Sequence, residues 1–267
     1  MPSPYTIASD LKHPGLAPFV RLRQSAIIEE LGHGFFVAET YKVVRLLLES
    51  STEVLRILGT PEWLEKLQPL IQARGLNAEQ VICLSLEQMQ SVVGFSLHQG
   101  LMALAKRPDD SPLSELDSKI IVLNGIVNPE NVGSIVRSAI PFGHKSIIAD
   151  EKSADPFIRR AARVSMGYVF DSKVYRSENL LDDLRILKAK GYRIIGSDLR
   201  RPGTRLPDFE FPERYALIIG SEVHGMAPEI LDFCDAILFI PTVDSGQAFN
   251  ASHAAAILLY AASVSGR

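Results

Sequence analysis

The chain has 267 residues, enough for two domains of ordinary size and too few for three. Hydrophobic residues make up 46% of it and charged residues 22%, a composition that excludes a disordered or fibrous protein. The formal net charge of −3 excludes a basic field over the whole molecule, so any contact with nucleic acid must depend on local clusters of basic residues.

Short β-rich runs alternate with amphipathic helices in the first part of the chain, which predicts a small α/β domain. A lead-in over residues 1–30 precedes them. It contains prolines, the basic residues Arg21 and Arg23 and a short helix, and its sequence allows it either to pack on this domain or to reach a partner. The expected elements are strands at 34–39, 52–58, 80–85 and 100–105, and helices at Thr40–Glu49, Pro61–Ala73 and Leu86–Val92.

A segment rich in proline, acidic and small residues follows at positions 106–118. Such a composition avoids both a buried core and a sheet, as a linker between domains must. We therefore expect an N-terminal domain over residues 1–107, a linker over 108–118 and a C-terminal domain over 119–267.

The strands of the second part are continuous apolar runs. Runs that are apolar on both faces predict an α/β fold with a mostly parallel sheet and helices on each side of it. The expected strands lie at 119–123, 145–149, 168–174, 192–197, 215–220 and 236–240, and the expected helices at Pro129–Phe142, Asp155–Ala162, Asn179–Lys190, Ala227–Asp232 and Asn250–Ser263.

Residues 124–143, NGIVNPENVGSIVRSAIPFG, come directly after the first of these strands. We expect Asn128 to cap a helix that begins at Pro129 and has one apolar side. Arg137 lies off that side, four residues after Gly133, so its side chain should lean toward the helix N-terminus, where backbone amides favour a phosphate. A solvent-facing arginine on an amphipathic helix is the alternative that these residues leave open.

Two further stretches follow later strands. Residues 217–229, LIIGSEVHGMAPE, place Gly220, Glu222 and Gly225 where glycine lets backbone approach a ligand closely. Residues 240–260, IPTVDSGQAFNASHAAAILLY, hold a polar loop and a helix that Asn250 or Ser252 can cap. Taken singly, these stretches are also compatible with purely structural roles: Glu222 as a turn-stabilising carboxylate and Asn250 as a cap.

In this order, the three stretches resemble the signature motifs of the SpoU-type (TrmH-type) RNA 2'-O-ribose methyltransferases of the SPOUT superfamily. The matching residues are Asn131, Gly133 and Arg137 in the first motif, Gly220, Glu222 and Gly225 in the second, and Ile240, Pro241, Asn250 and Ser252 in the third. The likeness extends over residues 119–260. The runs HGFFVAETYKVVRLLLES and SLHQGLMALAKR are similar to the family's substrate-binding domain, which has a ribosomal-protein-like α/β fold.

The resemblance implies a deep trefoil knot in the C-terminal domain and a homodimer formed through it. It implies that S-adenosyl-L-methionine binds at Gly220, Gly225, Ile240 and Phe249. It further implies a catalytic site of Arg137, Asn131, Glu222 and Asn250, in which the arginine acts with the RNA's own phosphate on the proton of a ribose 2'-hydroxyl. The expected activity is methylation of that hydroxyl in rRNA or tRNA. Separately from the resemblance, the lack of a secretion signal and of a membrane-spanning apolar run predicts a cytoplasmic protein.

RNA contacts are expected from local clusters of arginines, and the candidates are Arg21 with Arg23, Arg159 with Arg160 and Arg163, and Arg200 with Arg201 and Arg205. Arg159, Arg160 and Arg163 stand at spacings of one, three and four residues, which place them largely on one face of a predicted helix. The alternative is an ordinary solvated helix face.

The third motif departs from the family pattern at three positions: Asp244 stands in place of a glycine, Ala248 in place of a serine and Phe249 in place of a leucine. These changes allow a second hypothesis, an RNA-binding relative that has lost methyl transfer. A third hypothesis is an unrelated α/β hydrolase or nucleotide-dependent transferase. It would require a nucleophile elbow or a phosphate-binding loop, and the sequence contains neither.

Metal ions and membranes are not expected partners. The six histidines show no ligand spacing. No apolar run is long enough to span a bilayer, and the first residues lack the order of a secretion signal. Cys83 and Cys234 lie far apart in apolar runs, which is typical of buried free thiols.

Overall fold

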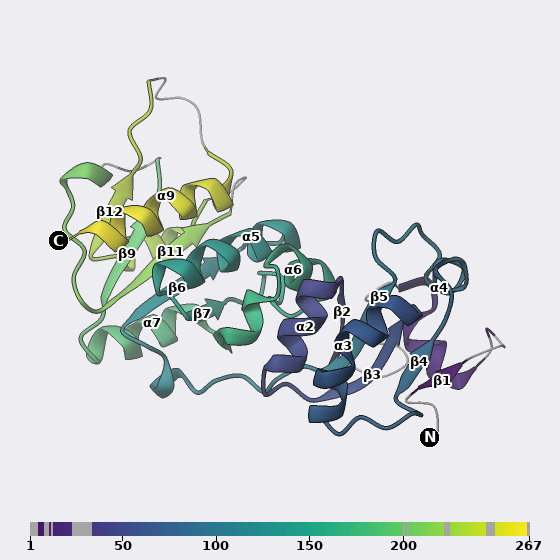
Figure 1. The fold of residues 1–267 in the computed structure, drawn as a ribbon. Helices are drawn as coiled ribbons and strands as arrows, with labels where there is room; N and C mark the ends of the chain where they lie inside the picture. The colour runs from purple at the N-terminus through teal and green to yellow at the C-terminus, as the bar shows by residue number, and fades with distance from the viewer. Residues whose placement is uncertain are drawn as a thin grey trace. The chain divides into compact units, whose positions relative to one another are not determined.

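The computed structural model describes residues 5–7, 11, 13–22, 34–199, 201, 203–221, 225–243 and 249–265. The chain forms two compact units, and a segment of the second half of the sequence belongs to the first of them (Figure 1). The first unit consists of residues 1–109 and 157–170, and the second of residues 110–156 and 171–267.

The first unit contains a mixed five-stranded sheet. Its strand order is β1 (Thr6–Ile7), β4 (Val81–Cys83), β3 (Val54–Gly59), β5 (Leu101–Lys106) and β2 (Phe35–Glu39). The β2–β5 and β3–β5 pairs are antiparallel, and the other pairs are parallel. Its helices are α2 (Tyr41–Glu49), α3 (Pro61–Ala73) and α4 (Leu86–Val93). These helices confirm the three that the sequence predicts.

Local signals explain where these helices begin and end. The side chain of Ser85 accepts a hydrogen bond from the backbone N–H of Gln88 while the Gln88 side chain accepts one from the N–H of Ser85, a capping box at the start of α4. Gly94 ends this helix at φ = 80°, in the left-handed region that favours glycine. The α3 helix has Pro61 in its first turn, where a missing N–H costs nothing.

The lead-in packs on the first unit. Leu16 and Phe19, within the 3₁₀ segment η1 (Pro14–Leu22), are fully buried and belong to the same core as strands β2 to β5. Strand β1 pairs with β4, and the Thr6 hydroxyl donates to the carbonyl oxygen of Ala78 at 2.8 Å. The described part of the lead-in is therefore an integral part of this unit, which answers a question that the sequence left open.

Residues 157–170 complete the first unit. The rings of Phe157 and Phe170 pack against Phe36, with centroids 6.0 Å and 5.8 Å away. Two predictions were wrong here. Helix α6 (Arg159–Val164) begins four residues later than expected: Pro156 disfavours helical backbone at Asp155, and Ile158, with φ = −60° and ψ = 148°, is still extended. The strand expected over 168–174 starts with a 3₁₀ turn, η4 (Tyr168–Asp171), and only β8 (Lys173–Arg176) is extended.

The second unit contains a seven-stranded sheet in which every pair is parallel, as its apolar runs predict. Its order is β10 (Thr204–Arg205), β12 (Ala236–Phe239), β9 (Arg193–Ser197), β11 (Tyr215–Gly220), β6 (Lys119–Asn124), β7 (Ser146–Ala149) and β8. The short edge strand β10 was not predicted.

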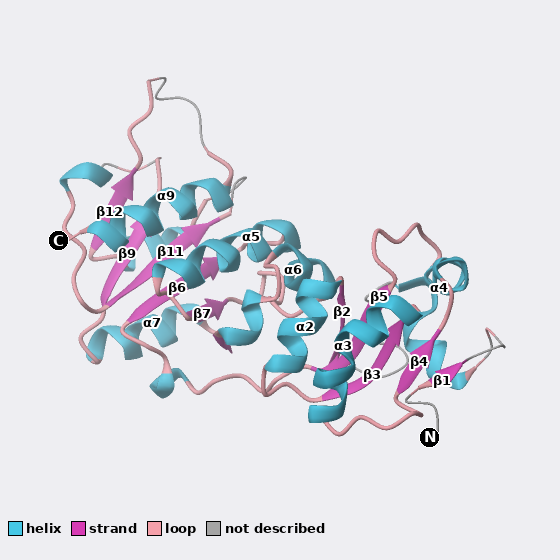
Figure 2. Ribbon diagram, in the orientation of Figure 1, coloured by secondary structure: helices cyan, strands magenta, loops and turns pink. Residues whose placement is uncertain are grey.

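Helices cover both faces of this sheet. One face packs against α7 (Leu180–Ala189) and α8 (Pro228–Phe233) in a core that alternate residues of β6 and β11 share. Helices α5 (Pro129–Ala139) and α9 (Ala251–Val264) lie side by side on the other (Figure 2). Because all seven strands are parallel, their carboxyl ends meet at one edge, where the loops that carry the three motifs begin.

No helix in the described part of the chain is long and apolar enough to cross a membrane. Both cysteines are free; Cys83 is buried and Cys234 is half-buried. Burial raises the pKa of each thiol, for Cys234 to about 12.

Candidate functional site

The first motif begins in a tight turn between β6 and α5. Asn124 ends the strand, Gly125 has φ = 72°, and the Asn128 side chain accepts a hydrogen bond of 2.9 Å from the backbone N–H of Glu130. The predicted cap at Asn128 is therefore confirmed. Val132, Val136 and the other apolar residues of α5 are fully buried, so the helix is fixed against the sheet.

A buried carboxylate that the sequence reading missed holds this turn. Asp150, which follows β7 and is 2% exposed, accepts hydrogen bonds from the Asn124 side chain at 2.8 Å and from the backbone N–H of Gly125 at 2.9 Å. Ser153 donates to it from its hydroxyl at 2.6 Å and from its backbone at 2.8 Å. The available signal was an aspartate directly after an apolar strand, at the edge where parallel strands end.

The second motif is tied to the first through Asn124. The Asn124 side-chain oxygen accepts a hydrogen bond of 3.1 Å from the backbone N–H of Ala227, just before α8. A β-carbon at Gly220 would lie 2.7 Å from the amide nitrogen of Met226, so the chain itself comes close to Gly220. Gly225 has φ = 64° and donates from its N–H to the Ser221 carbonyl at 2.7 Å. Both glycines are thus required by the path of the backbone.

The third motif contacts the first directly. The Asn250 amide donates a 3.1 Å hydrogen bond to the side-chain oxygen of Asn131, which is 8% exposed. The side-chain oxygen of Asn250 meanwhile accepts from the backbone N–H of Ser252 at 2.9 Å and from its hydroxyl at 2.7 Å. Asn250 therefore caps α9 and also joins two motifs that lie 119 residues apart in the sequence.

Arg137 lies in the last turn of α5 and is exposed. It makes no hydrogen bond or ion pair with any described residue, whereas Asn131 on the same helix faces Asn250. The guanidinium can therefore receive an anion without first giving up a partner within the described chain.

Two apolar residues flank the third motif. Ile240, which follows β12, is half-buried, and the Phe249 side chain before the α9 cap is 42% exposed. Glu222, Asp244 and Ala248, on which the sequence analysis also relied, lie outside the described residues. The described site thus offers carboxamides, backbone groups and apolar surface. These groups are chemically suited to a neutral heterocyclic ring with polar edges.

Two of the three arginines predicted to contact RNA are bound to a carboxylate within the first unit. Glu39 at the end of β2 is 5% exposed and accepts from Arg159 at 2.7 Å, with Arg163 at 3.0 Å from its other oxygen. The Arg159 guanidinium also lies 5.2 Å from the centroid of the Phe95 ring. Arg160, between them in sequence, is exposed. Two of the three arginines therefore neutralise a buried carboxylate.

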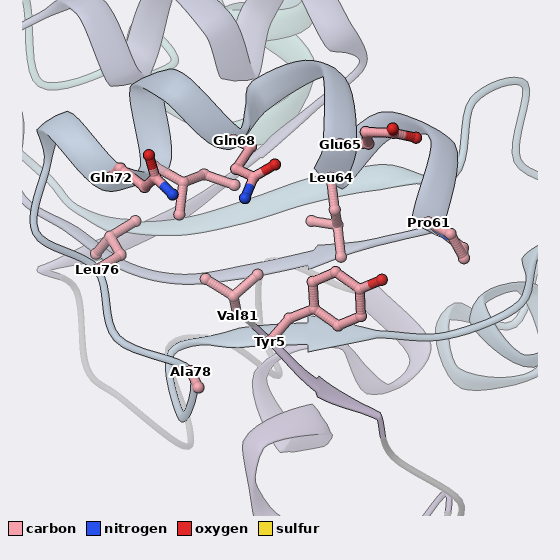
Figure 3. Close-up of a pocket in the computed structure, with 10 residues that line it drawn as sticks. Tyr5, Pro61, Leu64, Glu65, Gln68, Gln72, Leu76, Ala78 and Val81 are labelled. Atoms are coloured by element: carbon pink, nitrogen blue, oxygen red, sulfur yellow. The ribbon is translucent and has the colours of Figure 1, made fainter. Parts of the chain in front are cut away.

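A cavity of about 650 Å³ lies within the first unit, between α3 and strands β4 and β1 (Figure 3). Leu64, Ile71 and Val81 contribute apolar side chains to its lining, Gln68 and Gln72 line it from α3, and Tyr5 lines it from the position before β1. None of the residues predicted for the site lines it.

Among the described residues, no group of three or more histidine, cysteine, aspartate or glutamate side chains is arranged to hold a metal ion.

Comparison with known proteins identifies a family whose sequences this chain matches. The model of the SpoU rRNA Methylase family matches residues 118–260, slightly more than half of the chain and all three motifs. An uncharacterized tRNA/rRNA methyltransferase of Mycobacterium bovis is 29% identical over 241 residues, which cover 88% of this chain and 83% of that protein.

Solved structures share the fold over nearly the whole length. An rRNA methyltransferase of Sinorhizobium meliloti with bound AdoMet superimposes with a TM-score of 0.80 at 20% identity, covering 97% of this chain and 98% of that one. A solved RNA 2'-O ribose methyltransferase superimposes with a TM-score of 0.72 at 20% identity and covers 97% of each chain. The likeness therefore includes the first unit as well as the second.

Proposed function

This chain belongs to the SpoU rRNA methylase family, and from that premise we propose that it methylates a ribose 2'-hydroxyl of rRNA or tRNA with S-adenosylmethionine as the methyl donor. Membership makes the chain an RNA methyltransferase of this family. The position of the methyl group on the ribose is supported by the likeness to a solved RNA 2'-O ribose methyltransferase, and the choice of RNA by relatives described as tRNA/rRNA methyltransferases.

The hydrogen bond between Asn250 and Asn131 carries this proposal. It joins the first and third motifs at the carboxyl edge of the parallel sheet, the edge where α/β folds bind their ligands. A helix cap alone needs only the side-chain oxygen of Asn250. The additional use of its amide on a buried residue of a second motif indicates a site assembled from both.

We assign the methyl donor to the loops after β11 and β12, at Gly220, Gly225, Ile240 and Phe249. Their chemistry fits it: Phe249 and Ile240 offer apolar surface for an adenine ring, and Ser221 and Gly225, joined by a backbone hydrogen bond after β11, bring backbone polar groups to the same edge. S-adenosylmethionine supplies a methyl group that is already electrophilic, because it is attached to a positively charged sulfur. The residues of the chain must therefore prepare the nucleophile.

Arg137 is assigned to the RNA at the reacting hydroxyl. An arginine stays protonated at neutral pH, so its guanidinium is suited to hold a phosphate next to the 2'-hydroxyl rather than to accept the proton itself. Removal of that proton as the hydroxyl attacks is the step that needs help, and the phosphate held by Arg137 can assist it. Asn131, Asn250 and Glu222 fix the surrounding groups, and orientation of the two reactants lowers the barrier further.

The remaining family properties extend the proposal. The first unit is assigned to RNA binding, and the second to a trefoil-knotted catalytic domain that forms a homodimer through α9. This helix supports a dimer because it is apolar on its outer side as well: the exposed fraction of Tyr260 is 59% and that of Val264 is 43%.

Two measurements test the proposal in sequence. Calorimetric titration of the full-length protein with S-adenosylmethionine is expected to show micromolar binding. Methylation of RNA from cells that lack this protein, followed by nuclease digestion and mass spectrometry, is expected to yield a 2'-O-methylated nucleoside. Methylation of a base instead would reject the ribose assignment, and RNA binding without any methyl donor binding would favour the non-catalytic relative that Asp244 and Ala248 suggest.

A further inference from the structure

Two aromatic side chains of the first unit stand together where α2 and α3 begin. Tyr41 is the first residue of α2, Trp63 lies in the first turn of α3, and their ring centroids are 5.3 Å apart with an angle of 35° between the planes. Both residues are half-buried and keep accessible surface. The Lys66 ammonium lies 4.3 Å from the centroid of the Trp63 ring. The two helices lie side by side in this unit (Figure 1).

The aromatic pair is not needed to bury either helix. The core-facing side of α2 consists of Val43, Val44, Leu47 and Leu48, and that of α3 of Leu64, Leu67 and Ile71. Tyr41 and Trp63 lie outside these buried sets. A tryptophan and a tyrosine that contact each other and keep part of their surface accessible offer ring surface that a flat ligand can cover.

Backbone hydrogen bonds hold the pair in place. The Gln99 side chain accepts a 2.7 Å hydrogen bond from the backbone N–H of Tyr41. One residue further along, the carbonyl of Gly100 accepts from the N–H of Thr60 at 2.9 Å, just before α3. The segment that leads into β5 thus fixes the starts of both helices and presets the arrangement of the two rings.

We propose that Tyr41 and Trp63 form a stacking site for an unpaired base of the RNA substrate. This rests on the RNA-binding role proposed for the first unit. Every base has a π-face that an aromatic ring can cover, so such a site binds unpaired bases without a preference for sequence. Lys66 is already paired with Glu62 at 2.7 Å, which partly neutralises the cluster. The site therefore contributes stacking and little phosphate attraction.

The tryptophan itself provides the measurement, because Trp63 is the single tryptophan of the chain. Full-length protein is titrated with an oligouridine of about 12 nucleotides, a length within the usual range for single-strand sites. Saturable quenching of Trp63 fluorescence is expected. A blunt RNA duplex of the same length, in which every base is paired, is expected to leave the fluorescence unchanged.

Substitutions then separate stacking from charge. Trp63→Ala and Tyr41→Ala are expected to weaken oligouridine binding, measured by anisotropy of a labelled strand, at least about fivefold each. The slope of log affinity against log salt concentration should stay the same, because no phosphate contact is lost. Trp63→Phe and Tyr41→Phe, which keep a ring, should retain most of the affinity.

Leu86→Ala, at an exposed apolar position of α4 in the same unit, is the matched control. Thermal unfolding checks each variant.

Three outcomes would overturn the site. RNA binding with unchanged Trp63 fluorescence and undiminished affinity in both alanine variants would remove the site and leave the RNA substrate standing. A changed salt slope in those variants would replace stacking by a phosphate contact. If the wild-type protein binds no oligouridine, the stacking site and the RNA-binding role of the first unit fall together, whereas failure to bind S-adenosylmethionine would reject methyl transfer alone.

Discussion

At the scale of single residues, a substitution of Arg137 tests whether binding of the methyl donor and catalysis depend on different side chains, as proposed. Its side chain is exposed and unpartnered among the described residues, so Arg137→Ala should change the free energy of unfolding by less than about 0.5 kcal/mol. Because the proposed role is to hold the RNA phosphate at the reacting hydroxyl, methyl transfer should fall by roughly 100-fold or more. Affinity for S-adenosylmethionine, measured by calorimetry, should not change.

Arg137→Lys provides the control for charge. Lysine keeps the positive charge and loses the two parallel hydrogen bonds that a guanidinium makes to a phosphate. Its activity is therefore expected between that of the wild type and that of the alanine variant. Full activity in Arg137→Ala would remove this residue from the proposed mechanism.

A second residue-scale prediction concerns stability in acid. His144, two residues before β7, is fully buried; its Nε2 lies 2.5 Å from the Tyr215 hydroxyl and its Nδ1 lies 3.1 Å from the Phe142 carbonyl oxygen. That carbonyl can only accept, so Nδ1 donates and Nε2 accepts from the tyrosine. Burial, with a smaller contribution from the charge of Lys119, lowers the pKa of His144 to about 4.

The direction of the pH effect follows from that lowered pKa. As the pH falls below about 6.5, His144 takes up a proton in the unfolded chain but not in the folded one, so stability is lost. Between pH 7 and pH 5 this amounts to about 2 kcal/mol. His144→Gln, whose amide can also donate and accept, should lose correspondingly less stability over that range. Urea unfolding of both proteins at the two pH values is the measurement; equal losses would contradict the assignment.

The residue scale also shows what the sequence could predict of the site. The caps at Asn128 and Asn250 were predictable because each depends on residues two positions away. The contact between Asn250 and Asn131 and the role of Asp150 were not, because they join segments from different strands. The family resemblance named Asn131 and Asn250, but only the fold supplies the bond between them.

At the scale of elements, the helices were easier to predict than the shortest strands. Helix α3 runs from Pro61 to Ala73 as expected, since its first residue and its apolar spacing are local signals. Strands β1 and β10 have two residues each, too few to show alternation, and exist only through pairing with β4 and β12. A strand of that length is defined by its partner rather than by its own residues.

Helix α9 carries the element-scale prediction. Its exposed Tyr260 also contacts Phe142, with ring centroids 6.3 Å apart, so the apolar surface extends beyond the helix. If this surface forms the proposed dimer, Tyr260→Glu places a charge in an apolar interface and should convert the dimer into a monomer. Sedimentation velocity reports the change. The control is Ile186→Glu, which introduces the same charge at an exposed apolar position of α7, where the exposed fraction is 45%. A wild-type monomer would contradict the dimer.

At the scale of the whole molecule, the low net charge means that RNA affinity must come from local basic residues. The three arginines predicted for this purpose, Arg159, Arg160 and Arg163, do not have the same surroundings. Arg159 and Arg163 neutralise the buried Glu39 within the first unit, whereas Arg160 is exposed. Arg159→Ala should therefore lower stability by about 2 kcal/mol, because a buried carboxylate loses one of its two partners. A reversal of charge at Arg159 would leave Glu39 facing a second negative charge and would destabilise the first unit. A loss of RNA binding in that variant would therefore not report a lost RNA contact.

Arg160→Gln is the variant that tests RNA contact. If Arg160 neutralises one phosphate, its removal should make the slope of log affinity against log salt concentration shallower by about 1. Arg159→Gln serves as the matched comparison, since it removes the same charge one residue away, at a side chain that is bound to the buried Glu39. An unchanged slope for Arg160→Gln, in a protein that still binds RNA, would assign the phosphate contacts to other residues and leave this helix a structural part of the first unit.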